Sequence, residues 1–270
     1  MATIAQISDL HFGRHSPAAA EDLLASLRAR NPDLVVVTGD LTQRARHSEF
    51  TAARHFLGRI ARPKLIVPGN HDMPLYNVIH RFLTPFAKYH RYISPLGLTG
   101  DLFSNEAIAV LGLNTARRFT HKSGRISPAQ IAQICRIFAQ VPHDVFKALA
   151  THHPLGYPDD ERPRRLAARS ALALDAIAAA GVHVLMSGHH HRALSGDMSI
   201  EIGARGSVLI LHAGTAISTR VRGTEGNSYN LIRIAGERLT ISLMARVAGQ
   251  GFGETRVRSY QLEEGRWRPS

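Results

Sequence analysis

Along the first two thirds of the chain, short runs of consecutive apolar residues alternate with longer stretches in which apolar residues recur at helical spacing. Asp33–Thr38 is typical of the short runs, and it predicts a strand that is buried on both faces. This alternation indicates strand–helix–strand units, in which the strands run parallel. The predicted strands cover residues 2–8, 33–38, 64–68, 106–113, 145–151, 182–187 and 206–212, and the predicted helices cover residues 17–30, 45–60, 127–140 and 168–180.

The last part of the chain has a different pattern. Residues 228–235 and 238–246 are rich in β-forming residues, and Gly236-Glu237 between them predicts a hairpin. We therefore expect an α/β fold with two packed sheets covered by helices. The final residues, 251–270, are expected to form a C-terminal tail beyond the folded domain.

Two stretches interrupt the alternation and look like insertions over a site. Residues 74–98 mix aromatic, basic and proline residues, and residues 156–170 are rich in proline and charge. Aromatic and basic side chains in a small cap are suited to stacking a base or holding an anion. Packing on the sheet edge and a homodimer contact are the alternatives for residues 74–98.

The chain is strongly basic, with 33 Lys and Arg against 21 Asp and Glu, a formal net charge of +12. Such a surplus attracts phosphates, nucleic acid or anionic lipid headgroups. A genome-wide preference for Arg is the alternative, because all but four of the basic residues are Arg.

The remaining composition argues for an intracellular protein. The single cysteine, Cys135, excludes an internal disulfide and lies on a predicted amphipathic helix, where we expect a core thiol. No run of about 18 apolar residues could span a bilayer. The N-terminus has no signal-peptide features, so we expect a cytoplasmic location.

Polar residues with metal-binding side chains follow five successive predicted strands. In parallel α/β sheets the carboxyl ends of the strands lie along one edge, where ligands bind. Residues far apart in the sequence are therefore expected to meet there. The five segments are Asp9-Leu10-His11, Gly39-Asp40, Gly69-Asn70-His71-Asp72, His152-His153-Pro154 and Gly188-His189-His190-His191.

Carboxylate, imidazole and amide side chains together suit transition-metal ions. Asp9 and His11 are two residues apart on an extended segment, so both reach the same side, and His189 and His191 share this spacing. The set holds too many ligands for one ion, and a carboxylate can bridge two. It therefore predicts a pair of metals about 3.5–4 Å apart.

Each segment alone has an ordinary explanation. Gly-Asp after a strand is commonly a turn, and Gly-Asn-His-Asp is compatible with an Asx turn. His-His-Pro fits a surface loop, whereas three adjacent histidines rarely serve packing. The order of all five segments, each after a strand, favours a metal site over these explanations.

The same order resembles the signature of the calcineurin-like metallophosphoesterases, over residues 9–191, and Ala213-Gly214-Thr215-Ala216 is also similar to that family. Within it, the chain looks closest to bacterial class III cyclic nucleotide phosphodiesterases. The resemblance implies a four-layer α/β/β/α sandwich, with a metallophosphoesterase domain at residues 1–250 that includes the cap-like insertion at about 74–98.

The resemblance also implies a role for each site residue. His71 would contact the phosphate or the leaving oxygen, oriented by Asp72 or a similar carboxylate. His153 and His190 occupy variable positions and are left out. The first metal would be held by Asp9, His11 and His191, the second by Asn70, His152 and His189, and both by Asp40.

The implied reaction is hydrolysis of a phosphodiester by a hydroxide that the two cations generate from water. Iron or manganese is the expected metal, with zinc, cobalt or nickel as alternatives. His71 would stabilise charge on the phosphoryl oxygens or protonate the leaving group. In the loop at residues 114–125, Arg117, Arg118 and His121 are candidates for substrate contacts.

Differences from related families narrow the substrate. The Asp-Arg-Gly run of protein Ser/Thr phosphatases and the metal-bound Tyr of purple acid phosphatases do not follow Asp40, where Gln43 stands instead. UDP-diacylglucosamine hydrolases typically have Arg in place of His71. A small phosphodiester, with cyclic nucleotides foremost, is therefore expected. A UDP-2,3-diacylglucosamine-type pyrophosphohydrolase or a nuclease on the same metal core stays open, and a non-enzymatic scaffold is disfavoured because no ligand is missing.

Overall fold

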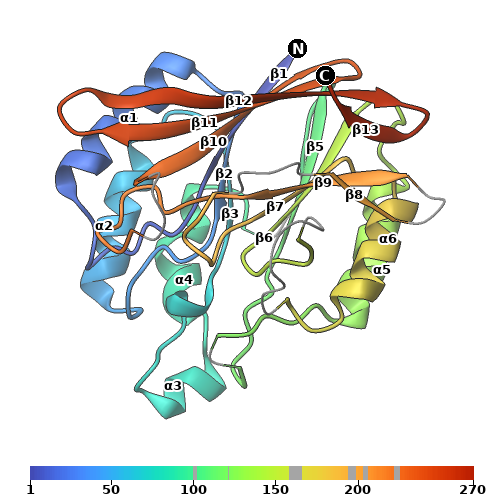
Figure 1. Cartoon of the computed structure of the whole chain (residues 1–270). Coiled ribbons are helices and arrows are strands. Elements are labelled where there is room, and N and C mark those ends of the chain that lie inside the picture. Colours follow the sequence, from blue (N-terminus) through green and yellow to red (C-terminus); the bar gives the residue numbers. More distant parts are fainter. Residues whose placement is uncertain (100–101, 121, 158–165, 194–198, 203–205, 222–225) are drawn as a thin grey trace.

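Two β-sheets pack face to face and carry helices on their outer sides in the computed structural model of the chain (Figure 1). The structure describes residues 1–270 except 100–101, 121, 158–165, 194–198, 203–205 and 222–225. The layers confirm the expected four-layer α/β/β/α sandwich. Each predicted helix and strand of the alternating region is present, with ends shifted by at most a few residues.

The first sheet joins the N-terminal and C-terminal parts of the chain. β1 pairs in parallel with β2 on one side and antiparallel with β10 on the other. Alternate residues of β2 face opposite sides: Val35 and Val37 face the helices, and Leu34 and Val36 face the other sheet. The sheet order is β13 (Arg266–Pro269), β12 (Gly251–Glu263), β11 (Arg238–Val247), β10 (Ser228–Ala235), β1 (Ala2–Ile7), β2 (Leu34–Thr38) and β3 (Lys64–Val67).

The second sheet is parallel at its centre. All residues of β5, β6, β7 and β9 are buried, as expected for strands covered on both faces. Its order is β4 (Leu102–Ser104), β5 (Ile108–Leu113), β6 (Phe146–Thr151), β7 (Val184–Ser187), β9 (Ser207–His212) and β8 (Ser199–Glu201).

Four helices cover the two outer faces. α1 (Pro17–Arg30) and α2 (His47–Gly58) pack on the first sheet, and α5 (Pro128–Phe138) and α6 (Ser170–Ala179) pack on the second. Local sequence explains their ends: Ser16 and Ser127 cap α1 and α5, and a proline follows each cap. Three apolar layers result, one between the sheets and one under each helix pair.

Two expectations from the sequence are wrong. Residues 251–270 are not a separate tail, because β12 pairs along β11 and β13 pairs with β12. The sequence of these residues shows no clear apolar strand pattern, because this edge ribbon is mostly solvated and carries polar residues on its exposed face. Cys135 is exposed and is not a core thiol, because the buried face of α5 carries Ile134 and Phe138 instead.

Residues 74–98 divide into a packed part and a projecting part. α4 (Ala87–Tyr92) and η2 (Ser94–Leu96) lie against α2, and Tyr89 is buried with its hydroxyl donating to the Ile66 carbonyl at 2.8 Å. α3 (Val78–Leu83) projects from the molecule, and exposes three apolar side chains, Val78, Ile79 and Leu83. Most aromatic residues of this segment therefore serve packing.

None of the helices that the structure describes has the length and apolar character needed to cross a bilayer.

Arg81 joins the projecting segment to the loop after β5. Its side chain is buried and donates hydrogen bonds to the carbonyls of Arg118, Pro74 and Thr120 at 3.0, 3.1 and 2.9 Å. Replacing it leaves three carbonyls without these charged donors. We expect Arg81→Ala to lower the free energy of unfolding by about 2–4 kcal/mol in urea titrations.

The matched control for this prediction is Arg28→Ala, on the exposed face of α1, which should change stability by less than about 0.5 kcal/mol. Equal stability of the Arg81 and Arg28 variants would show that the three hydrogen bonds do not hold this segment in place.

Candidate metal centre

The strand ends of both sheets converge at one place, as their sequence positions predict. β1, β2 and β3 of the first sheet lead into Asp9, Asp40 and Asn70, the last at the start of the short helix η1 (Asn70–Asp72). β6 and β7 of the second sheet lead into His152 and His189. The residues therefore meet across the seam between the two sheets.

Asp9, His11, Asp40 and His191 form the first cluster, and one ligand atom of each lies within 4.8 Å of those of the others. All four side chains are buried. The Asp9 Oδ1 atom lies 3.2 Å from His191 Nε2 and 3.6 Å from His11 Nε2, and the two Nε2 atoms are 3.1 Å apart.

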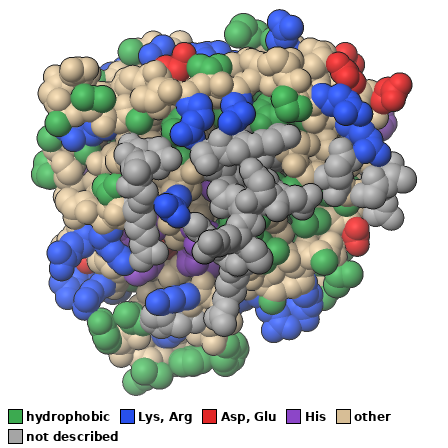
Figure 2. Space-filling model, viewed as in Figure 1, with side chains coloured by type: hydrophobic (Ala, Val, Ile, Leu, Met, Phe, Trp, Pro, Cys, Tyr) green, Lys and Arg blue, Asp and Glu red, His purple; other side chains and the backbone are tan. Residues whose placement is uncertain are grey.

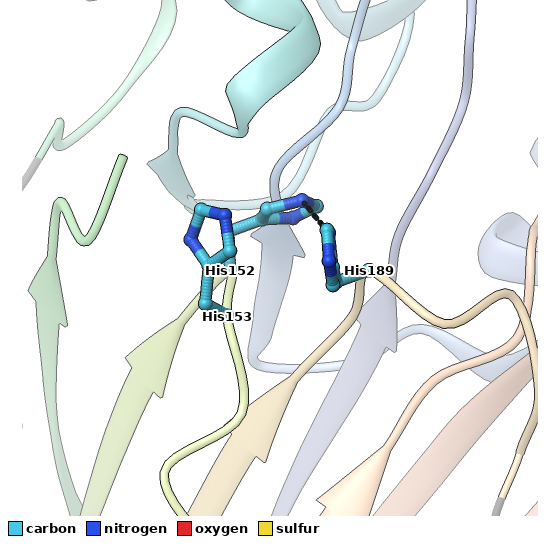
Figure 3. A group of neighbouring side chains, drawn as sticks. All are labelled: His152, His153 and His189. Carbon is cyan, nitrogen blue, oxygen red and sulfur yellow. Dashed lines mark hydrogen bonds between the residues drawn. The ribbon is translucent and has the colours of Figure 1, made fainter. Parts of the chain in front are cut away.

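His152, His153 and His189 form the second cluster (Figure 3). His152 Nε2 lies 3.3 Å from His189 Nδ1 and 3.3 Å from the amide oxygen of Asn70. His153, which the sequence analysis left out, has its Nδ1 2.9 Å from the Thr115 hydroxyl. The doubled histidine after β6 could have pointed to His153, but the second of these two positions is variable in the family pattern.

Asp40 lies between the two clusters. One of its carboxylate oxygens, Oδ2, lies 3.8 Å from His11 Nε2, and the other, Oδ1, lies 3.4 Å from His152 Nε2. The Oδ1 atom also accepts a hydrogen bond from the His71 amide at 2.9 Å. One oxygen directed at each cluster is the arrangement that a bridging carboxylate requires.

Five of these residues have left-handed backbone conformations, with φ angles of 52° at Asp9, 48° at His11, 53° at Asp40, 76° at His189 and 59° at His191. Non-glycine residues rarely adopt this region, and such residues concentrate at functional sites. The turns direct the side chains inward. Gly69 allows a close approach of two turns, because a Cβ atom there would collide with the Asp40 carboxylate.

Neighbouring groups hold the ligands in place. Asp9 Oδ2 accepts from the Ser8 hydroxyl at 2.6 Å and from the His189 amide at 3.0 Å, which leaves Oδ1 directed at the cluster. His152 Nδ1 lies 2.7 Å from the Thr38 carbonyl and His191 Nδ1 lies 3.1 Å from the Arg220 carbonyl. A carbonyl oxygen only accepts hydrogen bonds, so both rings carry a hydrogen on Nδ1 and present Nε2 to the cluster.

The charges at the site oppose the cost of burial. Burial alone would raise the pKa of Asp9, but His191, His11 and His152 outweigh it and hold the pKa well below its usual range. Burial disfavours a charged His152, but Asp40 and Asp9 raise its pKa to about 9. Burial and the neighbouring His152 lower the pKa of His189 to about 3.

This donor set fits metal cations. Asp9 Oδ1 is fully buried and has no hydrogen-bond partner among the described residues. The Nε2 atoms of His11, His152 and His191 face the carboxylates of Asp9 and Asp40. Cations would satisfy all these atoms together, and nitrogen and oxygen donors suit iron, manganese or zinc. The two clusters joined by Asp40 are therefore a candidate dinuclear site.

The family model of the calcineurin-like phosphoesterases matches residues 2–193. The chain belongs to the calcineurin-like phosphoesterase family. Every residue of the two clusters lies within residues 2–193 of this phosphoesterase.

Two curated relatives of this phosphoesterase are phosphodiesterases by name. It is 36% identical over 80 residues to the glycerophosphodiester phosphodiesterase GpdQ of Enterobacter lignolyticus, covering 26% of this chain and 29% of the relative. It is 31% identical over 81 residues to a probable cyclic nucleotide phosphodiesterase of Synechococcus, covering 27% and 32%. The matches thus span under a third of each relative.

Solved structures extend the likeness of the fold over nearly the whole phosphoesterase. A dimetal phosphatase from Danio rerio has a TM-score of 0.66 at 14% identity, covering 96% of this chain and 98% of that one. Purple acid phosphatase PPD1 from yellow lupin has a TM-score of 0.64 at 13% identity, covering 96% and 53%. At these identities the likeness concerns the fold.

In this phosphoesterase Asp72 does not orient His71, in contrast to the role expected from the sequence. Both Asp72 oxygens are used by the backbone: they accept from the amides of Leu41, Thr42 and Gly69 at 3.2, 2.9 and 2.9 Å. They also accept from the Thr42 hydroxyl at 3.0 Å. Asp72 therefore shapes the turns that carry Asp40 and Asn70.

The His71 ring is oriented by Gln43, which the sequence analysis noted only as a departure from another family. His71 Nδ1 lies 2.8 Å from the Gln43 carbonyl, so this nitrogen carries the proton. The His71 ring meets the His11 ring edge-on, with centroids 5.0 Å apart. His71 is half-buried, at the mouth of the first cluster.

The structure does not bring Arg117 to the clusters. Its guanidinium is half-buried and donates to the carbonyls of Asn114 and Ala116 and to the side chain of Gln130. Arg118 is exposed, donates to the Phe82 carbonyl and lies over the Phe119 ring. Their contact with substrate stays a prediction, and His121 lies outside the described residues.

We expect Asp40→Ala to lose both metal ions of the purified protein, because each Asp40 oxygen faces a different cluster. Metal content per chain, measured by inductively coupled plasma mass spectrometry, tests this. Asp144→Ala, at an exposed carboxylate, is the matched control and should keep its metal. Two ions per chain in the Asp40 variant would rule out the bridging role.

Metal affinity should increase with pH. Without metal, His152 keeps its proton up to about pH 9, and a metal must displace that proton to bind. Displacement of one proton makes the apparent affinity about tenfold stronger per pH unit below that pKa. Titration calorimetry of chelator-treated protein between pH 6 and 8 measures this slope, and a flat profile would contradict it.

Proposed function

We propose that this phosphoesterase hydrolyses small phosphodiesters at a dinuclear metal centre, with iron or manganese as the ions. The observation that carries the proposal is the geometry of Asp40, which directs one oxygen at each of two ligand clusters beside His71. Two phosphodiesterases among the curated relatives support a diester rather than a monoester.

When bound, a pair of divalent ions supplies a water nucleophile at neutral pH and neutralises charge on the phosphoryl oxygens. Asp9, His11 and His191 would hold one ion, Asn70, His152 and His189 the other, and Asp40 both. The backbone turns keep these side chains preorganised, so little reorganisation is needed during the reaction.

His71 acts on the substrate itself in this proposal. With Nδ1 donating to the Gln43 carbonyl, Nε2 is the ring nitrogen left for the substrate. A protonated ring donates from Nε2 to the leaving oxygen or to a phosphoryl oxygen. Gln43 positions the ring, so the neutral form has a defined tautomer.

Cyclic nucleotides are the first substrates to test, together with glycerophosphodiesters, because the names of the two relatives point to these classes. The assay uses the metal-loaded enzyme with a panel that also contains dinucleotides and UDP-diacylglucosamine. Hydrolysis of phosphomonoesters alone would refute the proposal. The cytoplasmic location expected from the sequence stays a prediction.

One observation favours a second candidate function, hydrolysis of a lipid-linked pyrophosphate. α3 exposes Val78, Ile79 and Leu83, next to basic side chains such as Arg118. An apolar chain and an anionic headgroup would both find partners there. A homodimer contact would use the same exposed residues, and the oligomeric state in solution separates these two uses of α3.

We expect His71→Ala to retain its metals but to lose about 10²–10⁴-fold in turnover on diesters with poor leaving groups. The loss should be much smaller for an activated aryl diester, because a nitrophenolate leaves without a proton. Steady-state kinetics on both substrate types, with metal content measured in parallel, tests the role.

Equal losses on the two substrate types would show that His71 binds phosphate instead of acting as an acid. Gln43→Ala removes only the Gln43 side chain, and the backbone carbonyl that accepts from His71 Nδ1 remains. Turnover on diesters with poor leaving groups should therefore fall less in Gln43→Ala than in His71→Ala.

A further inference from the structure

A basic cavity opens beside His71. Its volume is about 640 Å³, and it is formed by the loops that follow β1, β2 and β3, by the start of α2 and by residue 220. On this face of the molecule, histidine side chains are visible with Lys and Arg side chains around them (Figure 2). The lining residues are Gly13, Arg14, Gln43, Arg44, Arg46, Glu49, His71 and Arg220.

Among the described residues, no ion pair balances the positive charges of this cavity. Its one carboxylate, Glu49, caps α2: Oε2 accepts from the amides of Arg44 and Arg46 at 2.8 and 3.2 Å. None of the ion pairs found within the described residues involves the four arginines of the cavity, which are Arg14, Arg44, Arg46 and Arg220. Four guanidinium groups around one cavity repel each other, and an anion bound among them would relieve that repulsion.

The cavity is continuous with the metal centre. Arg220 contributes to both, because its carbonyl lies 3.1 Å from His191 Nδ1 and its guanidinium donates to the Gln43 side chain at 3.2 Å. Gln43 in turn orients His71, which lies between the cavity and His11. A substrate with its phosphoryl group at the metal centre would therefore extend into this cavity.

We propose that the cavity binds a second anionic group of the substrate, so that the preferred diester carries a further phosphate or similar anion. This inference rests on the proposed function and names its substrate class. Guanidinium groups suit phosphate because their parallel N–H groups match two phosphate oxygens. Arg44 and Arg46, exposed and anchored through their backbone, determine specificity by binding this group.

A matched pair of substrates tests the proposal. Thymidine 5′-(p-nitrophenyl phosphate) and its 3′-phosphorylated form share the scissile bond and the leaving group, and differ by one phosphate. We expect the wild-type enzyme to have a KM about tenfold lower for the phosphorylated form, with similar kcat. The double variant Arg44→Gln/Arg46→Gln should lose this preference, because its KM for the phosphorylated form rises to the KM for the unphosphorylated form.

Arg54→Gln is the control, because Arg54 is exposed on α2 and does not line the cavity. It removes a positive charge from the same helix region and should keep the preference. Thermal melts establish that each variant is folded.

The outcomes separate this inference from the proposed function. Equal KM values for the two substrates, or an unchanged preference in the double variant, would overturn the second anionic group while hydrolysis still stands. Failure of the metal-loaded enzyme on both substrates and on every diester of the panel above would overturn the proposed function itself. Because a nucleic acid also supplies a second phosphate, a short single-stranded DNA is the third substrate. Faster, arginine-dependent cleavage of that DNA would assign the cavity to a polymer.

Discussion

Two carboxylates, Asp9 and Asp40, lie fully buried at the seam between the sheets, with imidazoles of His11, His152 and His191 around them. Burying an ionised carboxylate costs several kcal/mol unless charges or hydrogen bonds compensate. The histidines compensate in part, and Asp9 Oδ1 still has no hydrogen-bond donor among the described residues. Cations would complete the balance, so the fold of this region and the candidate metal site depend on the same atoms.

The rest of the structure holds these atoms in place. Three apolar layers and fully buried parallel strands fix where each strand ends. That rigidity sustains left-handed conformations at five residues of the candidate site, each of which costs about 1–3 kcal/mol. The packing of the whole domain offsets this conformational cost. The side chains of the candidate site are therefore already arranged to bind cations with little rearrangement.

Charge is distributed in two zones. The candidate metal centre gathers carboxylates that attract cations, and the neighbouring cavity gathers arginines that attract anions. A phosphate ester matches this pairing, because its oxygens can contact metals while other anionic groups contact guanidinium. His71 and Arg220 lie where the two zones meet, and Gln43 links them.

The sequence by itself determined the order of elements and most of the residues that cluster in the candidate metal centre. Runs of apolar residues defined β1, β2, β6 and β7, and parallel strands bring their carboxyl ends to one edge whatever the details of packing. Serine caps and prolines set the starts of α1 and α5. Only the tertiary structure decided that Asp72 binds backbone amides, that the Gln43 carbonyl orients His71, and that arginines from separate loops share a cavity. It also placed β12 and β13 in the first sheet. These features depend on partners distant in sequence, often main-chain atoms that every residue possesses, so no residue pattern marks them in advance.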